Sequence, residues 1–220
     1  MVKSKRISIY TRKEKKKFIS EATKSVEREF GVKRSSYARW MCKDGYIFDI
    51  AFSEYVDDNL ISCILSVKPI YVDDLLWYII YKKELRPFSL RITGGLAVTQ
   101  IRLKEFYDWE INGDEGYEQA ELVKLYRNIY SSISGEVEKF LKTNPDVEKF
   151  YYYNPVWYDN ILAILILCHQ QKYAQALAMT EKEITMGKSG GCTFIMPDGN
   201  EKTTLEFVRE YCTEKLKCNS

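Results

Sequence analysis

The chain of 220 residues is 45% hydrophobic and 14% aromatic, and its 33 basic and 31 acidic side chains give a net charge of +2. A chain of this length and apolar content forms a core without disulfides or a structural metal. The balanced charge excludes a global field that would gather polyanions, so a nucleic-acid site would have to be a local patch.

Several features of the sequence predict a cytoplasmic protein without a membrane span or a cofactor. Charges interrupt the first residues, which argues against a signal peptide, and the longest apolar run, 161–168, is far shorter than the roughly 20 residues that cross a bilayer. The six cysteines have no C-x-x-C spacing, which is typical of free thiols in a reducing compartment. His169 is the single histidine, which argues against a zinc site.

The first half of the chain predicts a helix followed by an antiparallel sheet. Residues 11–30 carry apolar side chains at helical spacing, and Gly31 follows as a stop signal. Three runs of strand-like residues, separated by turn sequences, then predict a meander of strands at 37–42, 47–52 and 61–67. After Pro69 the period becomes helical again.

Residues 88–111 permit two interpretations. They predict one or two further strands, but "RLKEFYDW" within them also fits a short helix. The sequence "NGDEG" at 112–116 predicts a linker.

The second half is predicted to be mainly helical. An apolar stripe runs along 117–144, a helical hairpin turns near 170–172, and a last helix follows the turn at 197–200. We therefore expect an α+β fold, in which an N-terminal helix packs on an antiparallel β-meander of three to five strands, followed by a mainly helical C-terminal half. The predicted lobes are 1–111 and 117–220, packed together as one domain.

The tetrapeptide Tyr-Val-Asp-Asp occurs twice, at 55–58 and at 71–74. It resembles the metal-binding motif of reverse transcriptases, but a polymerase needs a further carboxylate from another element and more chain before the motif. The first copy instead predicts a hairpin turn, and the second copy predicts a helix cap at Asp73 or Asp74. A metal-dependent enzyme with a carboxylate site is the third interpretation of the chain, after the two binding functions given below.

The sequence "MGKSGG" at 186–191 resembles the end of a phosphate-binding P-loop. The full motif needs a glycine five residues before Gly187, where Lys182 stands, and a preceding strand, where a helix is predicted. A helix C-cap followed by a loop is the better prediction.

The N-terminal arm is the strongest charge asymmetry of the chain. It predicts a nucleic-acid site at four lysines, in which phosphates would be neutralised, or alternatively the solvated outer face of a helix. The four candidates are Lys13, Lys15, Lys16 and Lys17.

The run "KFYYYNPVWY" at 149–158 is rich in aromatic residues. It predicts either a packed joint between the lobes or a protein-binding surface, to which the acidic turn would contribute. The candidate protein-binding residues are Tyr151, Tyr152, Tyr153, Trp157, Tyr158, Asp57 and Asp58. No serine or cysteine stands in a recognisable nucleophile motif beside His169, so no catalytic residue is predicted.

Two stretches show a family resemblance. "KYAQALAMTEKEI" is similar to the second helix of a tetratricopeptide repeat, with Tyr173, Ala176 and Leu177 at its packing positions, although Ile164 stands where the first helix would have a small residue. The order of a basic helix, a meander containing "RWMCKDGYIFDIAF" and then helices resembles bacterial domains of unknown function, some of which are immunity proteins against toxins. This resemblance implies a small cytoplasmic α+β protein that works by binding another protein. Non-enzymatic protein binding is therefore the leading expectation, and nucleic-acid binding by the basic arm is the alternative.

Overall fold

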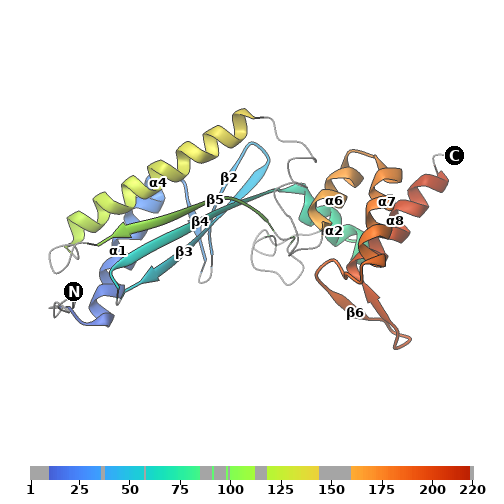
Figure 1. The fold of residues 1–220 in the computed structure, drawn as a ribbon, viewed down its shortest axis with the longest axis horizontal. Helices are drawn as coiled ribbons and strands as arrows, with labels where there is room; N and C mark the ends of the chain where they lie inside the picture. The colour runs from blue at the N-terminus through green and yellow to red at the C-terminus, as the bar shows by residue number, and fades with distance from the viewer. Residues whose placement is uncertain are drawn as a thin grey trace, which may run out of the picture. The chain divides into compact units, whose positions relative to one another are not determined.

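The fold is α+β, as the sequence predicts, with an N-terminal helix, an antiparallel sheet and a helical C-terminal half (Figure 1). The computed structural model describes residues 10–35, 38–56, 58–84, 91, 98, 100–111, 118–143 and 160–218. The helices within these ranges are α1 (Arg12–Glu29), α2 (Tyr71–Tyr81), α4 (Gln119–Lys142), α6 (Ile161–His169), α7 (Tyr173–Thr185) and α8 (Thr204–Cys218). The strands are β1 (Lys33–Arg34), β2 (Arg39–Lys43), β3 (Tyr46–Tyr55), β4 (Leu60–Pro69), β5 (Ile101–Glu110), β6 (Thr193–Ile195) and β7 (Glu201–Thr203).

The larger sheet is a meander in which β1 to β5 lie side by side in chain order. Asp44 and Gly45 connect β2 to β3 with φ angles of 49° and 81°, the left-handed pair that a two-residue type I′ hairpin requires. Asn59 has a φ of 56° in the turn between β3 and β4. The predicted meander is thus confirmed. Residues 101–110 form β5, so the helical interpretation of "RLKEFYDW" is wrong.

The chain divides into two compact units that cut across its halves. Unit 1 comprises 1–41, 48–66 and 103–143, and unit 2 comprises 42–47, 67–102 and 144–220. Helix α4, although it follows the predicted linker, belongs to unit 1 with α1.

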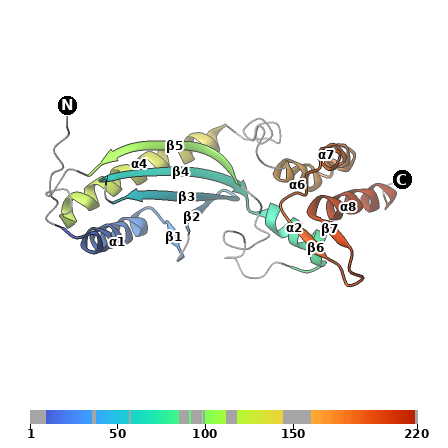
Figure 2. The same cartoon turned by 60° about the horizontal axis from the view of Figure 1, so that its bottom comes forward.

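In unit 1, helices α1 and α4 pack against each other beside the sheet (Figures 1 and 2). Helix α1 begins with a capping box between Thr11 and Glu14. Aromatic rings join α4 to one face of β3, where Phe52 meets both Tyr126 and Tyr130 with ring centroids 5.8 and 5.7 Å apart. Alternate residues of β3 point to the same face, so this side of the strand is buried against α4.

A charged network also lies within unit 1 and joins α1 to the sheet. Glu27 is almost fully buried and accepts hydrogen bonds from Arg39 Nε at 2.9 Å and Arg34 Nη1 at 3.2 Å. Arg39 also donates to Glu54 at 3.2 Å, while its guanidinium lies 4.8 Å from the ring centroid of Phe52. The buried carboxylate is therefore paired, as the cost of burying a charge demands.

Unit 2 is built around α6, whose residues 161–168 are all buried. Helices α2 and α7 both pack on α6, and α8 packs on α2 and α7. The predicted hairpin turn is confirmed, because Gln171, with a φ of 61°, links α6 to α7. Within the described residues no helix is both long and apolar enough to cross a membrane.

Candidate functional site

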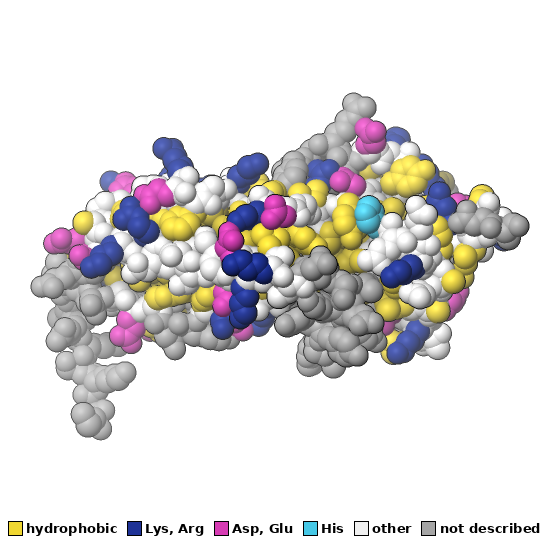
Figure 3. Space-filling model, turned by 90° about the horizontal axis from the view of Figure 1, so that it is seen from above, with side chains coloured by type: hydrophobic (Ala, Val, Ile, Leu, Met, Phe, Trp, Pro, Cys, Tyr) yellow, Lys and Arg dark blue, Asp and Glu magenta, His cyan; other side chains and the backbone are white. Residues whose placement is uncertain are grey.

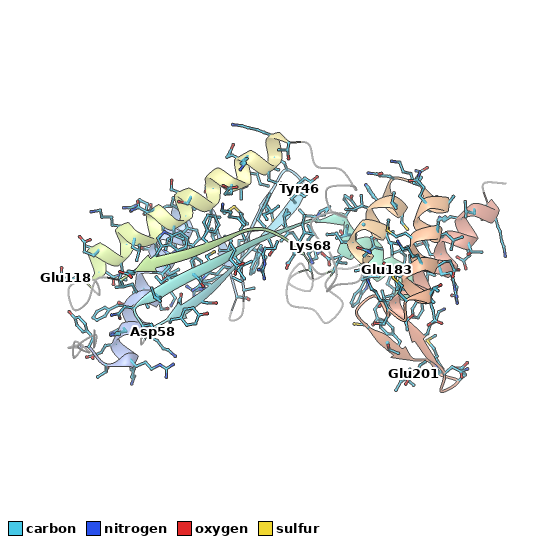
Figure 4. The ribbon with its side chains drawn as sticks, in the orientation of Figure 1. Tyr46, Asp58, Lys68, Glu118, Glu183 and Glu201 are labelled. Carbon is cyan, nitrogen blue, oxygen red and sulfur yellow. The ribbon has the colours of Figure 1, made fainter. Side chains whose placement is uncertain are left out.

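The predicted protein-binding residues fall mostly outside the described part of the chain. Tyr151, Tyr152, Tyr153, Trp157, Tyr158 and Asp57 all lie outside it. Asp58 is exposed in the turn between β3 and β4, where its main-chain N–H donates to the carbonyl of Tyr55 at 3.1 Å (Figure 4). The predicted turn is therefore present at this copy of the tetrapeptide.

The four lysines of the basic arm have different surroundings. Lys15 is only 6% exposed, and its Nζ donates to Asn59 Oδ1 at 3.0 Å, so it joins α1 to the turn after β3. Lys13, Lys16 and Lys17 are exposed. The structure thus separates one lysine of the predicted site from the other three.

A basic stripe runs along the outward face of α1. Lys13, Lys17, Lys24 and Arg28 are spaced four, seven and four residues apart, which places them on one side of a helix, and all four are exposed. Glu21 lies near this stripe, with a carboxylate oxygen 4.0 Å from Lys17 Nζ. The stripe extends the predicted basic site by two residues, Lys24 and Arg28, that come after the charge run.

The second copy of the tetrapeptide is not a helix cap. The N-cap of α2 is Ile70, which offers no side-chain hydrogen bond, so the prediction of a cap at Asp73 or Asp74 is wrong. Both aspartates do lie in the first turn, where the helix dipole favours negative charge. Asp73 is buried, and its carboxylate is paired with a buried lysine.

That partner is Lys68, which is 0% exposed at the end of β4 (Figure 4). Its Nζ lies 2.9 Å from Asp73 Oδ1, 2.6 Å from the carbonyl of Arg91 and 2.8 Å from that of Val98. Asp73 Oδ1 also accepts from the Val98 N–H at 2.7 Å. Burial raises the pKa of Asp73 above its usual value, while Lys68 opposes this rise.

This buried pair has the properties of a structural clamp. An ammonium group has three protons, and three acceptors surround that of Lys68, so no donor is left for a substrate. The contacts join the end of β4, the first turn of α2 and the main chain at Arg91 and Val98. A clamp of this kind holds the main chain at Arg91 and Val98 against the end of β4 and the first turn of α2.

The glycine-rich sequence after α7 ends the helix. Lys188 N–H donates to the carbonyl of Glu183 at 3.1 Å and Gly187 N–H to that of Ile184 at 2.8 Å, which is the Schellman arrangement. Gly187 has a left-handed φ of 76°. The predicted C-cap is confirmed.

His169 is exposed at the end of α6 and stacks on Tyr71 of α2, with ring centroids 3.7 Å apart. In Figure 3 the histidine appears in cyan at the surface, next to hydrophobic side chains. Burial raises the pKa of Tyr71 to about 12. The imidazole has an aromatic neighbour, and its position is that of a surface packing residue.

A cluster of tyrosines and lysines on α2 and α8, in which the α2 tyrosines are exposed and the α8 tyrosine is only 8% exposed, is the most distinctive surface of unit 2. We call it the tyrosine–lysine cluster, and it comprises Tyr78, Tyr81, Lys82, Tyr211 and Lys215. Tyr78 and Tyr81 are 47% and 42% exposed, so two large rings within one helical turn face solvent. The ammonium of Lys82 lies 5.8 Å from the ring centroid of Tyr78 and 5.9 Å from that of Tyr211.

The same tyrosine on α8 holds a second cation. Lys215, one turn after Tyr211, places its ammonium 5.5 Å from the Tyr211 ring centroid. Tyr173 meets the edge of this ring at a centroid distance of 6.1 Å. The cluster therefore presents two ammonium groups held by cation–π contacts between two helices.

The backbone of Lys82 is in the left-handed region, with a φ of 54°, where it ends α2. Its N–H donates to the carbonyl of Tyr78 at 2.8 Å. Glycine is the residue that favours this conformation, and a side chain there costs about 1 kcal/mol. From this position the lysine side chain reaches both the Tyr78 and the Tyr211 ring.

Sequence patterns did not single out this cluster. Tyr71, Leu75, Tyr78 and Lys82 follow one flank of a helix, but this spacing also describes an ordinary buried face. Tyr211 and Lys215 lie far along the chain, so only the packing of α8 on α2 reveals the contact.

Among the residues that the structure describes, no group of three or more His, Cys, Asp or Glu side chains is arranged to hold a metal ion. A shallow depression of about 510 Å³ lies along the β6–β7 hairpin and the first turns of α8, and acidic and basic side chains both line it. Comparison with protein-family models, with curated proteins and with solved structures found no match.

Proposed function

We propose that the protein is a non-enzymatic binding module for another protein and that the tyrosine–lysine cluster is its contact surface. The observation that carries this proposal is the exposure of Tyr78 and Tyr81 beside two ring-bound ammonium groups. Tyrosine is among the residues that dominate the binding energy of protein interfaces, because its large ring loses little conformational entropy. The concrete form of the proposal is an immunity-like inhibitor in a bacterial cytoplasm, with the aromatic run at 149–158 as a second contact.

Site-specific crosslinking in cells tests the proposal. A photoreactive benzoylphenylalanine replaces Tyr78 in one variant and Tyr55, a similarly exposed tyrosine of β3 in unit 1, in the control. We expect position 78 to give a discrete protein adduct that position 55 does not give. Mass spectrometry of the adduct identifies the partner, which is then purified.

Binding of the purified partner completes the test. Tyr78→Ala is expected to weaken binding about tenfold or more, whereas Tyr55→Ala leaves it unchanged, because loss of a central aromatic contact typically has this effect. Absence of a specific adduct from position 78, or equal binding by Tyr78→Ala and the wild type, would contradict the proposal.

Nucleic-acid binding is the second candidate, and the basic stripe on α1 favours it. Four aligned basic side chains can contact successive phosphates, which would make binding strongly dependent on salt. A third crosslinking position at Lys24 distinguishes the candidates, because a nuclease-sensitive adduct there, without a protein adduct at position 78, would favour nucleic acid.

A further inference from the structure

We propose that the partner contacts the tyrosine–lysine cluster through an acidic segment, whose carboxylates bind Lys82 and Lys215. This inference rests on the proposed function and adds the chemistry of the bound segment. Its starting point is the position of two ammonium groups, both near the largely buried ring of Tyr211 and one also near the exposed ring of Tyr78.

The two ammonium groups remain available for a carboxylate. Among the described side chains, neither Lys82 nor Lys215 forms an ion pair, whereas Lys188 and Lys202 in the same unit are paired with Glu183 and Glu210. A cation–π contact uses one side of an ammonium group and leaves N–H donors directed to solvent. Tyrosine rings around these donors lower the local dielectric, which strengthens a charge-assisted hydrogen bond.

The backbone at Lys82 gives independent support. Glycine would end α2 without strain, and an uncharged residue would suffice to cap the helix. The lysine instead occupies a left-handed position that brings its ammonium over rings from two helices. Strained residues of this kind are often found where a side chain is held for binding.

The pattern of the cluster favours a protein over a nucleic acid. Single-stranded nucleic acid needs a continuous basic track along its backbone, and the cluster has two cations separated by the Tyr211 ring. An acidic protein segment places carboxylates between apolar side chains, which matches two ammonium groups in a cluster that also exposes the rings of Tyr78 and Tyr81.

The test uses a fluorescein-labelled peptide of alternating glutamate and phenylalanine, with a glutamine analogue as its control. We expect the glutamate peptide to bind the full-length protein. The glutamine analogue should bind at least about fivefold more weakly, as loss of exposed ion pairs predicts. Excess unlabelled single-stranded DNA should leave the glutamate peptide bound. Fluorescence anisotropy measures each affinity.

The decisive variant is Lys82→Gly, because it removes the ammonium while relieving the backbone. We expect it to raise the thermal unfolding midpoint and to weaken binding of the glutamate peptide about fivefold. Gln171→Gly is the matched control. Gln171 has a left-handed backbone like Lys82, but its side chain carries no charge. This variant should raise the unfolding midpoint in the same way and leave binding unchanged.

The outcomes separate this inference from the proposed function. No binding of the glutamate peptide, equal binding of the glutamine analogue, or full binding by Lys82→Gly overturns the acidic-segment proposal. A specific protein adduct at position 78 together with such a result would leave the proposed function standing. Displacement of the peptide by DNA would assign the cluster to nucleic acid and overturn both.

Discussion

At the scale of single residues, the two copies of Tyr-Val-Asp-Asp show how much the surroundings of identical letters differ. Asp58 is exposed in a hairpin turn, whereas Asp74, which holds the same place in the second copy, lies in the first turn of α2 and pairs with Arg91. The preceding Asp73 is buried against Lys68. The exposure of these aspartates differs because different residues pack on the two copies of the tetrapeptide. Lys68 stands at the end of an apolar strand, and its full burial is the clearest sign of a structural role.

Lys68→Met is expected to lower the free energy of unfolding by about 3–5 kcal/mol at neutral pH, because it leaves the Asp73 carboxylate buried without its cation. Urea denaturation measures the loss. Lys17→Met, which removes an exposed lysine 4.0 Å from Glu21, is the control and should change stability by less than about 0.5 kcal/mol.

The loss of unfolding free energy caused by Lys68→Met should become smaller as the pH falls from neutral toward about 5. Burial already raises the pKa of Asp73 in the folded state, and removal of Lys68 raises this pKa further. A group with a raised pKa favours the folded state at low pH and loses this contribution as the pH rises through that pKa. A deficit that is independent of pH would show that Asp73 is not the group left unpaired.

At the scale of helices and strands, amphipathic periodicity predicted α1 and α4 because each of these helices buries one face. The buried residues of α4 include Leu122, Ile129, Ile133 and Val137 of the predicted stripe. Tyr126 and Tyr130 are also buried, since the face that meets β3 is wider than an aliphatic stripe. The polar connection of α1 to the sheet has no sequence signature.

Two arginine–glutamate pairs in unit 1 allow a comparison of buried and exposed contacts between elements. Arg39→Met is expected to cost about 3 kcal/mol, because Glu27 is buried and loses its shortest ion pair. Arg127→Met should cost less than about 1 kcal/mol, because the Arg127–Glu29 pair between α4 and α1 is half exposed. Chemical denaturation of both variants measures the difference, and equal losses would contradict the structural role given to Glu27.

At the scale of the whole molecule, the two compact units share their strands. Strands β2, β3, β4 and β5 each contribute residues to both units. We expect these continuous strands to couple the unfolding of the two units.

Ile133→Ala tests this coupling, because it creates a cavity in the core of unit 1 and should cost about 2–5 kcal/mol. Hydrogen exchange of α6 and α8 in unit 2 is expected to become faster by the same change in free energy. Ser131→Ala, on the exposed side of the same helix, should leave exchange unchanged. Faster exchange confined to unit 1 would show that the units unfold separately.

The sequence by itself determined the fold class and most of the elements, although it did not predict β1 or the β6–β7 hairpin. Periodicity and turn residues predicted the N-terminal helix, the meander, the hairpin near Gln171 and the C-cap at Gly187, because the signals for each lie within a few neighbouring residues. The tertiary structure decided the rest, including the choice of a strand for residues 101–110, where a local pattern fits both states. It also decided the burial of Lys15 and Lys68 and the meeting of Lys82 with Tyr211, because these depend on contacts between residues far apart in the chain, which no local pattern encodes.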